Sequence, residues 1–484
     1  MSAGRVSTTR LIVALCALAI SHAALGNETL RLASTPIDVG LPPALGTPHP
    51  FEIASKVDYV LANGLTVTLV PFGTVPKATV LIDANTGHVA DQDLVSLAPL
   101  LAELLKEGAA SHSAQQMAAT FADMGGSLNV TADLNNVELR TSILSEHLPR
   151  ALALMADVLR RPTLPSDSLP RLKNDLTRAI AVARSEAQNV ASEAFAKMLW
   201  GSGPFSHGYP SEQDIAAVTV NDARQFIAHK LGARRTHIYI AGQFDQRAVE
   251  KAIRRHFGSW ATGALPDVNV PSSTAHRQVT LIDRPAATQS TILMGLPVLA
   301  VNDERYTELS VANSLLGGSL LSRLDQNLRE AKGYTYGASS LLTPYHGLST
   351  WTVTTDVNTP DTAAALHEMF KEISRLTSEP ATAQELRLIQ NYRAGHFVLS
   401  ASSPSSLLSQ LQFIDQYQLP ASYLSHYVAR TNAVTPDQVL SAASHAWQPA
   451  LMSLVIVGDL AKIRAPLLAL QELQGIDLHS PGME

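Results

Sequence analysis

The stretch AVTVNDARQFIAHKL (Ala217–Leu231) has a counterpart, AVTPDQVLSAASHAW (Ala433–Trp447), that begins 216 residues later in the chain (433 − 217). In each copy a threonine, Thr219 or Thr435, stands just before the run and is suited to cap the amino end of a helix. In the second copy Gln438 completes a capping box. The two stretches predict equivalent helices in two related parts of the chain.

The similarity continues beyond these helices. THIYIAGQFD from Thr236 and MSLVIVGDLA from Met452 both have the pattern of a buried strand that ends in glycine, and the glycines are again 216 residues apart (458 − 242). Two matched motifs at one offset indicate two homologous halves. The segment WATGALPDVNVPSSTAHR (Trp260–Arg277), which contains two prolines and two serines, is predicted to link them.

Strands and helices are mixed along each half rather than strictly alternating, which predicts an α+β fold instead of a parallel βαβ fold. Asn63-Gly64 separates two β-rich runs of VDYVLANGLTVTLVPF and predicts a hairpin. Helical periodicity follows over Leu94–Leu105, Ser113–Met124 and about 148–199. We therefore expect a mostly antiparallel sheet packed with helices in each half.

Length and composition favour a globular protein of more than one domain. The 484 residues exceed what one hydrophobic core usually serves. Apolar residues make up 46% of the chain and charged residues 16%, against roughly 25% charged in a typical soluble domain. The formal net charge of −6 gives no indication of a nucleic-acid or anionic-membrane partner.

The first residues have the pattern of a secretory signal. Arg5 and Arg10 precede the apolar run Leu11–Ile20, and small residues follow it, so residues 1–26 are predicted to be a signal peptide and 27–50 an extended arm. Ten apolar residues are too few to span a bilayer, which needs about 20. The single cysteine, Cys16, lies in this run, and Leu15 before it fits a lipoprotein cleavage site poorly. We expect an exported, periplasmic protein without disulfides and without a membrane span in the mature chain.

The sequence contains no HExxH, HxxEH, GxSxG or Walker motif, and its sixteen histidines are scattered. A carboxylate, Glu103, stands in the apolar helical run APLLAELLKEGA (Ala98–Ala109). A second stretch, ADMGGSLNVTADLNNVELRTSILSEHLPRALALMADVLRRPTLP (Ala122–Pro165), predicts a helix, a Gly-Gly break, a strand and another helix ending before Pro162. Taken alone, both stretches are explained by structural roles.

The stretch LLGGSLLSRLDQNLREAKGYTYGASS (Leu315–Ser340) is the strongest candidate for chemistry. Arg329 and Tyr336 fall on either side of a predicted helix-to-strand turn that contains Gly333, so both could contact one ligand. Arginine offers a planar fork of donors for carboxylate or carbonyl oxygens, and a tyrosine hydroxyl can donate to the same group. The alternative is a turn with an exposed arginine and a packed tyrosine. A helical stripe of five leucines is predicted to pack in the core: Leu316, Leu320, Leu321, Leu324 and Leu328.

Together, the paired halves and the stretches Ala122–Pro165 and Leu315–Ser340 resemble the insulinase/pitrilysin family of inverzincin zinc peptidases. The similarity is greatest to the group of the mitochondrial processing peptidase subunits and their bacterial two-subunit relatives, and it extends over about residues 50–470. It implies a peptidase-like half over 51–260, a linker over 261–277 and a second such half over 278–472. It also implies that the chain forms one half of a clam-shell.

Active members of this family carry HxxEH on the first long helix, with a third zinc ligand, a glutamate, about 76 residues further on. Alignment on Gly108 puts Pro99 and Glu103 at the histidine positions, Ala102 at the general-base position and Ala179 at the distal glutamate position. A catalytic zinc needs three protein ligands, and only Glu103 could be one. The resemblance therefore implies no zinc site and no catalytic residue in this chain, with Glu103 a leftover polar residue beside Lys106 or Lys173.

The family's second half supplies an arginine and, seven residues later, a tyrosine that help to bind substrate backbone. Arg329 and Tyr336 have this spacing (336 − 329), and Gly317 and Gly318 match part of the family's glycine-rich loop. The resemblance implies a non-catalytic subunit that binds peptides for an HxxEH-bearing, zinc-containing partner and is inactive alone. The alternatives are a binding or scaffold protein of the same fold and a metallopeptidase with a relocated metal site.

Overall fold

The structure is a computed structural model that describes residues 55–86, 93–133, 135–201, 204–206, 208–265, 277–476 and 478–479. The predicted signal peptide and arm (1–50) lie outside the described residues, as does most of the predicted linker. Among the described residues, no helix has both the length and the apolar character needed to cross a membrane.

The amino-terminal half is built on a six-stranded sheet in the order β1-β2-β8-β3-β7-β6, in which β2 and β8 are parallel and the other neighbours are antiparallel. Its strands are β1 (Val57–Val60), β2 (Thr66–Pro71), β3 (Lys77–Asn85), β6 (Leu128–Ala132), β7 (Asn136–Leu144) and β8 (Thr236–Gly242). A small separate pair is β4 (Gly108–Ala109) and β5 (His112–Ser113). The helices are α2 (Asp93–Lys106), α3 (Ala114–Asp123), α4 (Leu148–Arg160), α5 (Leu169–Ser185), α6 (Ala187–Trp200), α7 (Glu212–Ala217), α8 (Val220–Lys230) and α9 (Gln246–Phe257).

The carboxy-terminal half has a sheet in the order β11-β12-β10-β13-β9-β14, in which β9 is parallel to both β13 and β14. Its strands are β9 (Val279–Asp283), β10 (Gln289–Val298), β11 (Thr335–Tyr345), β12 (Leu348–Asn358), β13 (Ser453–Gly458) and β14 (Leu478–His479). Its helices are α10 (Tyr306–Leu316), the π-helical η5 (Asp325–Ala331), α11 (Thr362–Ser378), α12 (Ala383–Ser400), α13 (Pro404–Gln416), α14 (Tyr427–Ala433), α15 (Pro436–Ala446) and α16 (Leu460–Leu468).

The predicted internal duplication is confirmed by the strand orders. The run β2-β8-β3-β7-β6 in the first sheet corresponds strand by strand, in chain order and direction, to β9-β13-β10-β12-β11 in the second. Thr219 and Thr435 cap the equivalent helices α8 and α15, and both form capping boxes, because Asp222 takes in the first copy the role of Gln438 in the second. The fold is α+β with two homologous halves.

The repeated glycines have a shared steric cause. A Cβ on Gly242 would lie 2.3 Å from the Lys77 carbonyl oxygen at the start of β3, and the residue has φ +140°. A Cβ on Gly458 would lie 2.5 Å from the Ser290 hydroxyl near the start of β10. In both halves the strand therefore ends where the neighbouring strand comes too close for a side chain.

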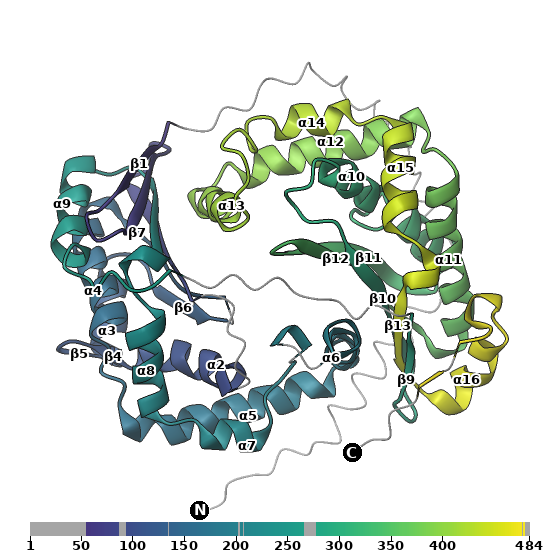
Figure 1. Cartoon of the computed structure of the whole chain (residues 1–484), viewed down its shortest axis with the longest axis horizontal. Coiled ribbons are helices and arrows are strands. Elements are labelled where there is room, and N and C mark those ends of the chain that lie inside the picture. The colour runs from purple at the N-terminus through teal and green to yellow at the C-terminus, as the bar shows by residue number, and fades with distance from the viewer. Residues whose placement is uncertain are drawn as a thin grey trace, which may run out of the picture. The chain divides into compact units, whose positions relative to one another are not determined.

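One helix of each half packs on the sheet of the other half (Figure 1). Helix α6 packs on β10 and β13, where its apolar side chains bury Leu293, Val455 and Val457. Helix α13 packs on β3 and β8, against Leu81 and Tyr239. The opposite faces of the two sheets are covered by helices of their own half, which form the two main cores. The two halves therefore share apolar packing in addition to their duplicated topology.

Two sequence predictions need correction. The Gly-Gly break is followed by a hairpin of two strands, β6 and β7, because Asp133 accepts hydrogen bonds from the backbone N–H groups of Asn135 and Asn136 and turns the chain. The predicted leucine stripe is interrupted: α10 ends at Leu316, and Leu320 and Leu321 lie in an exposed turn. The remaining three leucines of the stripe are buried. The Asn63-Gly64 hairpin is confirmed by the pairing of β1 with β2.

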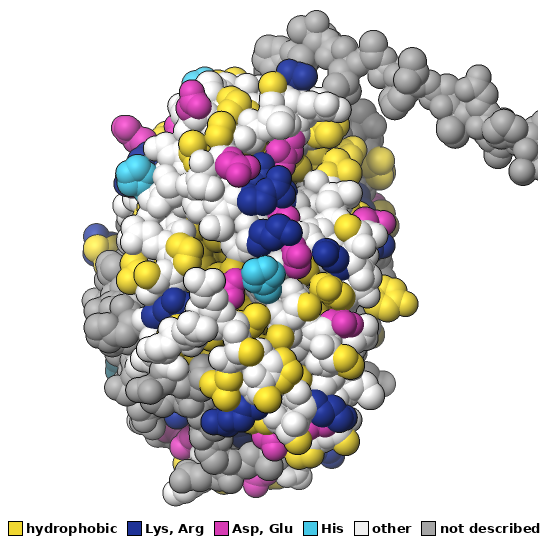
Figure 2. Space-filling view, turned by 90° about the vertical axis from the view of Figure 1, so that its right-hand side faces the viewer, with side chains coloured by type: hydrophobic (Ala, Val, Ile, Leu, Met, Phe, Trp, Pro, Cys, Tyr) yellow, Lys and Arg dark blue, Asp and Glu magenta, His cyan; other side chains and the backbone are white. Residues whose placement is uncertain are grey.

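Acidic and basic side chains are interspersed on the face shown in Figure 2, which carries no extensive patch of either sign. On α11, pairs of opposite charge lie one helical turn apart: Lys371 with Glu368 at 2.8 Å and Arg375 with Glu372 at 2.9 Å.

Candidate functional site

The positions that would correspond to zinc ligands lie on α2 and α5. Pro99 and Ala102 are on α2, where Ala102 is buried in the core, and Ala179 is exposed on α5. The side chains of Leu100, Leu101, Leu104 and Leu105 hold α2 in this core. The helix forms as expected from its periodicity, but at these positions it offers methyl and pyrrolidine groups that cannot bind a metal.

Glu103 is the exception, and its carboxylate is exposed and bonded to the Lys106 ammonium at 2.6 Å. Lys173, the other suggested partner, donates to the Ala216 carbonyl oxygen instead. Within the described ranges, no group of three His, Cys, Asp or Glu side chains is placed to hold a metal ion. The residues present therefore do not fit the zinc that the family implies, and no catalytic step through zinc follows from them.

Arg329 and Tyr336 lie together, at the end of η5 and the beginning of β11. Both line one surface cavity of about 300 Å³, with Gly333 at the turn between them, and Gln289 and Asn358 also line it. The Arg329 guanidinium is partly exposed, and among the described residues its ion pair is with the adjacent Glu330 carboxylate, at 3.5 Å. Tyr336 is 92% exposed, so it is not the packed tyrosine of the alternative interpretation.

Local backbone structure fixes this arrangement. The carboxylate of Asp325, buried at the start of η5, accepts a hydrogen bond from the Ala338 backbone N–H on β11 at 3.2 Å. Gly333, with φ +67°, donates to the Arg329 carbonyl oxygen and ends the helical segment. A π-helical turn of this kind is uncommon and often occurs at functional sites. These contacts position Arg329 and Tyr336 at the two ends of the turn, where both line the same cavity.

Gly317 and Gly318 are placed differently. A Cβ on Gly317 would lie 2.8 Å from the Ser340 backbone nitrogen, whose N–H group donates to the Gly317 carbonyl oxygen at 2.9 Å. A Cβ on Gly318 would lie 2.9 Å from the Ser314 Cα atom. Gly317 lets the turn after α10 lie against β11, and Gly318 lets the same turn lie against the end of α10. They do not line the Arg329–Tyr336 cavity, and Gly318 lines a separate one.

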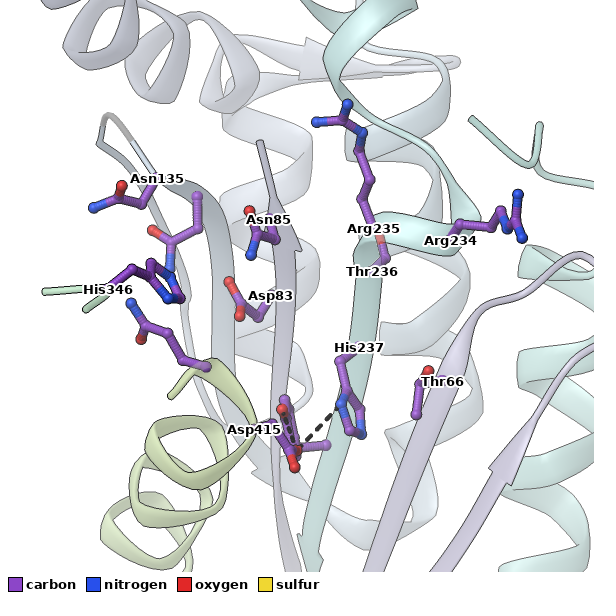
Figure 3. Close-up of a pocket in the computed structure, with 13 residues that line it drawn as sticks. Thr66, Asp83, Asn85, Asn135, Arg234, Arg235, Thr236, His237, His346 and Asp415 are labelled. Carbon is purple, nitrogen blue, oxygen red and sulfur yellow. Dashed lines mark hydrogen bonds and ion pairs between the residues drawn. The ribbon is translucent and has the colours of Figure 1, made fainter. Parts of the chain in front are cut away.

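A third set of polar side chains lines a cavity of about 210 Å³ between the first sheet and α13 (Figure 3). Asp83 comes from β3, His237 and Tyr239 from β8, and Asp415 from α13. The Asp415 carboxylate accepts a hydrogen bond from the Tyr239 hydroxyl at 2.7 Å and lies 3.3 Å from His237 Nδ1. The His237 ring is stacked on Tyr239, with a centroid distance of 3.8 Å.

Burial controls the charge of these groups. It lowers the pKa of His237 to about 3 and raises the pKa of Asp83 to about 7. Asp83 Oδ1 is buried and has no hydrogen-bond partner within the described ranges. Because the acidic and imidazole groups interact with one another across the two halves, this cluster is best explained as a polar contact that joins them.

Sequence reasoning did not identify this cluster. Asp83, His237 and Tyr239 occupy alternate positions of otherwise apolar strands, and this period-two pattern could have shown that one face of the sheet carries polar groups. Asp415, on α13, could not be associated with them from local sequence.

Comparison with known proteins agrees with the fold and the motifs. A family model described as Insulinase (Peptidase family M16) matches residues 69–208, and one described as Peptidase M16 inactive domain matches residues 217–392. The chain is 24% identical over 357 residues to the uncharacterized zinc protease YmxG of Bacillus subtilis, covering 73% of this chain and 86% of the relative. It is 25% identical over 401 residues to the uncharacterized zinc protease Mb2805c of Mycobacterium bovis, covering 80% and 89%.

Two solved structures share the fold. The peptidase M16 inactive domain from Pseudomonas fluorescens has a TM-score of 0.77 at 23% identity and covers 83% of this chain and 98% of its own. A protease from Helicobacter pylori has a TM-score of 0.76 at 16% identity and covers 84% and 100%. The matched family models, the duplicated α+β halves and the missing zinc ligands lead to one conclusion: the chain belongs to the insulinase (M16) peptidase family, as a non-catalytic-like member.

Proposed function

We propose that this chain is the non-catalytic subunit of an exported, heteromeric zinc metallopeptidase, in which it binds and helps to enclose peptides for a partner that carries HxxEH. One observation carries the proposal: Arg329 and Tyr336 share a cavity, whereas α2 offers no set of zinc ligands. The chain therefore keeps groups that can bind a peptide but, among the described residues, lacks the groups that would hold a catalytic zinc.

The geometry suits an extended peptide. A peptide backbone presents carbonyl oxygens at regular intervals, and the Arg329 guanidinium and Tyr336 hydroxyl are hydrogen-bond donors for such oxygens. Both side chains are accessible, and within the described part of the chain the Arg329 ion pair is a long one, 3.5 Å from Glu330. Binding at this cavity would position a peptide without supplying a nucleophile or a general base.

The relatives support the peptidase connection. Those reported above are named zinc proteases, and one structural neighbour is titled an M16 inactive domain. The zinc and the catalytic glutamate would then be in the partner subunit. The amino-terminal apolar run supports export to the periplasm, where the partner would be found.

The proposal is tested by reconstitution with an HxxEH-bearing homologue from the same source. Hydrolysis of a quenched fluorescent peptide is measured for this chain, for the partner and for their mixture. We expect negligible hydrolysis by this chain and a large gain on mixing, which disappears when the partner's HxxEH glutamate is changed to glutamine. No co-purification and no gain would contradict the proposal and favour a scaffold role. Stoichiometric zinc in this chain alone would favour a relocated metal site.

A further inference from the structure

A second cavity, of about 600 Å³, lies between α10, α12, α13 and α14 in the carboxy-terminal half. This volume is within the roughly 300–1,000 Å³ typical of small-ligand sites. Much of the lining is aromatic: Tyr306, Tyr392, Phe397, Phe413, Tyr423 and Tyr427. Phe397 and Tyr427 are stacked with a centroid distance of 4.3 Å, which gives one wall a flat apolar surface.

A cation lies in the same wall. The Arg393 guanidinium donates to the Ser310 carbonyl oxygen, the Ser314 hydroxyl, the Ser310 hydroxyl and the Tyr427 hydroxyl, at 2.6–3.0 Å. All four are neutral acceptors, and within the described part of the chain Arg393 has no ion pair with a carboxylate. Its Nε is buried and has no acceptor among the described residues. A partly buried cation without a counter-ion favours an anion in the adjoining space.

An unused acceptor lies on the other side of the cavity. Gln410, on α13, donates from Nε2 to the Ser400 hydroxyl at 2.9 Å, while its Oε1 is buried and has no donor in the part of the chain that the structure describes. The amide cannot simply be reversed, because the Ser400 hydroxyl already donates its proton to the Phe397 carbonyl oxygen at 2.8 Å. Gln410 Oε1 can therefore gain a hydrogen bond from a donor group of an occupant, such as a peptide N–H.

From these observations we propose that the aromatic cavity binds the carboxy-terminal residue of a peptide with an apolar or aromatic side chain. The side chain lies against Phe397 and Tyr427, the terminal carboxylate neutralises Arg393 in exchange for a hydroxyl partner, and the peptide N–H reaches Gln410. This site extends the proposed peptide-binding role, on which it rests for the nature of its occupant, but it is separate from the Arg329–Tyr336 cavity.

The test uses the full chain alone and a fluorescent tripeptide ending in phenylalanine, either with a free carboxylate or as the carboxy-terminal amide. We expect the free acid to bind at least about tenfold more tightly than the amide. Equal binding of both, or no binding of either, would overturn the proposal. Phenylpropionate is the third probe: if it binds as tightly as the peptide acid, the occupant is a small aromatic acid and the peptide assignment is wrong.

Two variants locate the site. R393Q should abolish the preference for the acid, but it also removes hydrogen bonds that join α12 to α10 and α14, so its folding is checked by thermal unfolding. H396W fills the cavity from an exposed lining position without loss of a hydrogen bond and should weaken binding of the acid about tenfold or more. Q384W, at an exposed position of the same helix away from the cavity, is the control. Full binding by H396W would overturn the site.

The reconstituted complex separates this inference from the proposed function. If H396W leaves the gain in hydrolysis on mixing intact while acid binding is lost, both claims hold. If tight acid binding persists in H396W while the mixture still shows the gain, only the cavity assignment fails. If mixing gives no gain, the subunit role fails, and the binding data alone decide the cavity.

Discussion

The resemblance to the family implies that the Glu103 carboxylate stands at the position of a zinc-binding histidine. Its ion pair with Lys106 is exposed, and such pairs contribute about 0–1 kcal/mol. We predict that Glu103→Gln changes the free energy of unfolding by less than about 1 kcal/mol and leaves hydrolysis by the reconstituted complex unchanged. Denaturant unfolding and peptide hydrolysis measure the two quantities.

The neighbouring Leu104 is the matched control for this experiment. It is fully buried, so Leu104→Ala should cost about 2–5 kcal/mol. If Glu103→Gln loses hydrolysis but keeps its stability, the carboxylate takes part in the chemistry. The interpretation of Glu103 as a leftover polar residue would then be wrong.

Asp83 makes a pH-dependent contribution to stability. Burial raises its pKa to about 7, above the ordinary 3.8, so the folded protein favours the protonated form and the contribution is lost as pH rises from about 4 to about 7. Asp83→Asn removes this loss. We predict that the melting temperature of Asp83→Asn relative to the unsubstituted protein increases from pH 5 to pH 8.

The exposed Asp123→Asn should show no such trend and serves as the control. A difference in melting temperature that is flat with pH for Asp83→Asn would mean that the carboxyl is ionised in the folded protein. His237 has the opposite effect on stability, because its lowered pKa means that stability is lost as pH falls below about 6.5. This contribution is the same in Asp83→Asn and in the unsubstituted protein, so the difference between their melting temperatures reports on Asp83.

Residues differ in how far sequence predicts their surroundings. The seven-residue spacing of Arg329 and Tyr336 was sufficient to place both at one turn, because the helical end and the glycine between them are local features. The contact of His237 with Asp415 was not predictable, because it depends on which helix of the second half covers the first sheet. Glu103 was expected beside Lys106 or Lys173, and the structure distinguishes between them.

Among the elements, β8 and β13 show how the duplicated halves are built. Gly242→Ala at the end of β8 introduces a Cβ 2.3 Å from the Lys77 carbonyl oxygen at φ +140°. We predict a loss of about 2 kcal/mol or more, measured by denaturant unfolding, because both the backbone conformation and the contact are unfavourable.

Gly395→Ala is the control for Gly242→Ala. Gly395 lies inside α12 with no atom near its Cβ position, so the change should be neutral or should stabilise by up to about 1 kcal/mol. Equal effects of the two changes would mean that the close approach of β3 to Gly242 does not constrain the strand end.

The positions of helices and strands were predictable from helix caps and from hydrophobic periodicity where these patterns are uninterrupted. The capped helices α8 and α15 and the buried strands β8 and β13 were predicted from the repeat itself. The prediction that five leucines form one helical stripe was wrong. Gly317 and Gly318 end α10, and the chain enters a helix again only near Leu324, so the five leucines do not lie on one continuous helix. A periodic apolar pattern that crosses a glycine pair does not distinguish one continuous helix from two helical segments separated by a turn.

At the scale of the whole molecule, α6 and α13 are each packed on the sheet of the other half. A chain of residues 51–260 would lack the cover of β3 and β8, and a chain of 278–484 would lack the cover of Leu293, Val455 and Val457. We predict that each half alone aggregates or unfolds at lower temperature than the intact protein, as followed by circular dichroism and size exclusion.

Co-expression of the two halves should restore a soluble one-to-one complex. Recovery of the intact protein's melting temperature by one half alone would show that the exchanged helices contribute little to stability. Sequence could not predict this exchange, because the apolar faces of α6 and α13 are equally compatible with a sheet of their own half.

The central claim is that the chain retains peptide binding without zinc chemistry. Its most direct test is the reconstituted complex with Arg329→Ala and Tyr336→Ala combined, compared with the exposed-site control Arg247→Ala. We predict that the double variant assembles normally but has kcat/KM for peptide hydrolysis lowered at least about tenfold, as expected for the loss of two hydrogen-bonding groups, while Arg247→Ala is unaffected. Unaltered hydrolysis by an intact complex carrying the double variant would contradict the account.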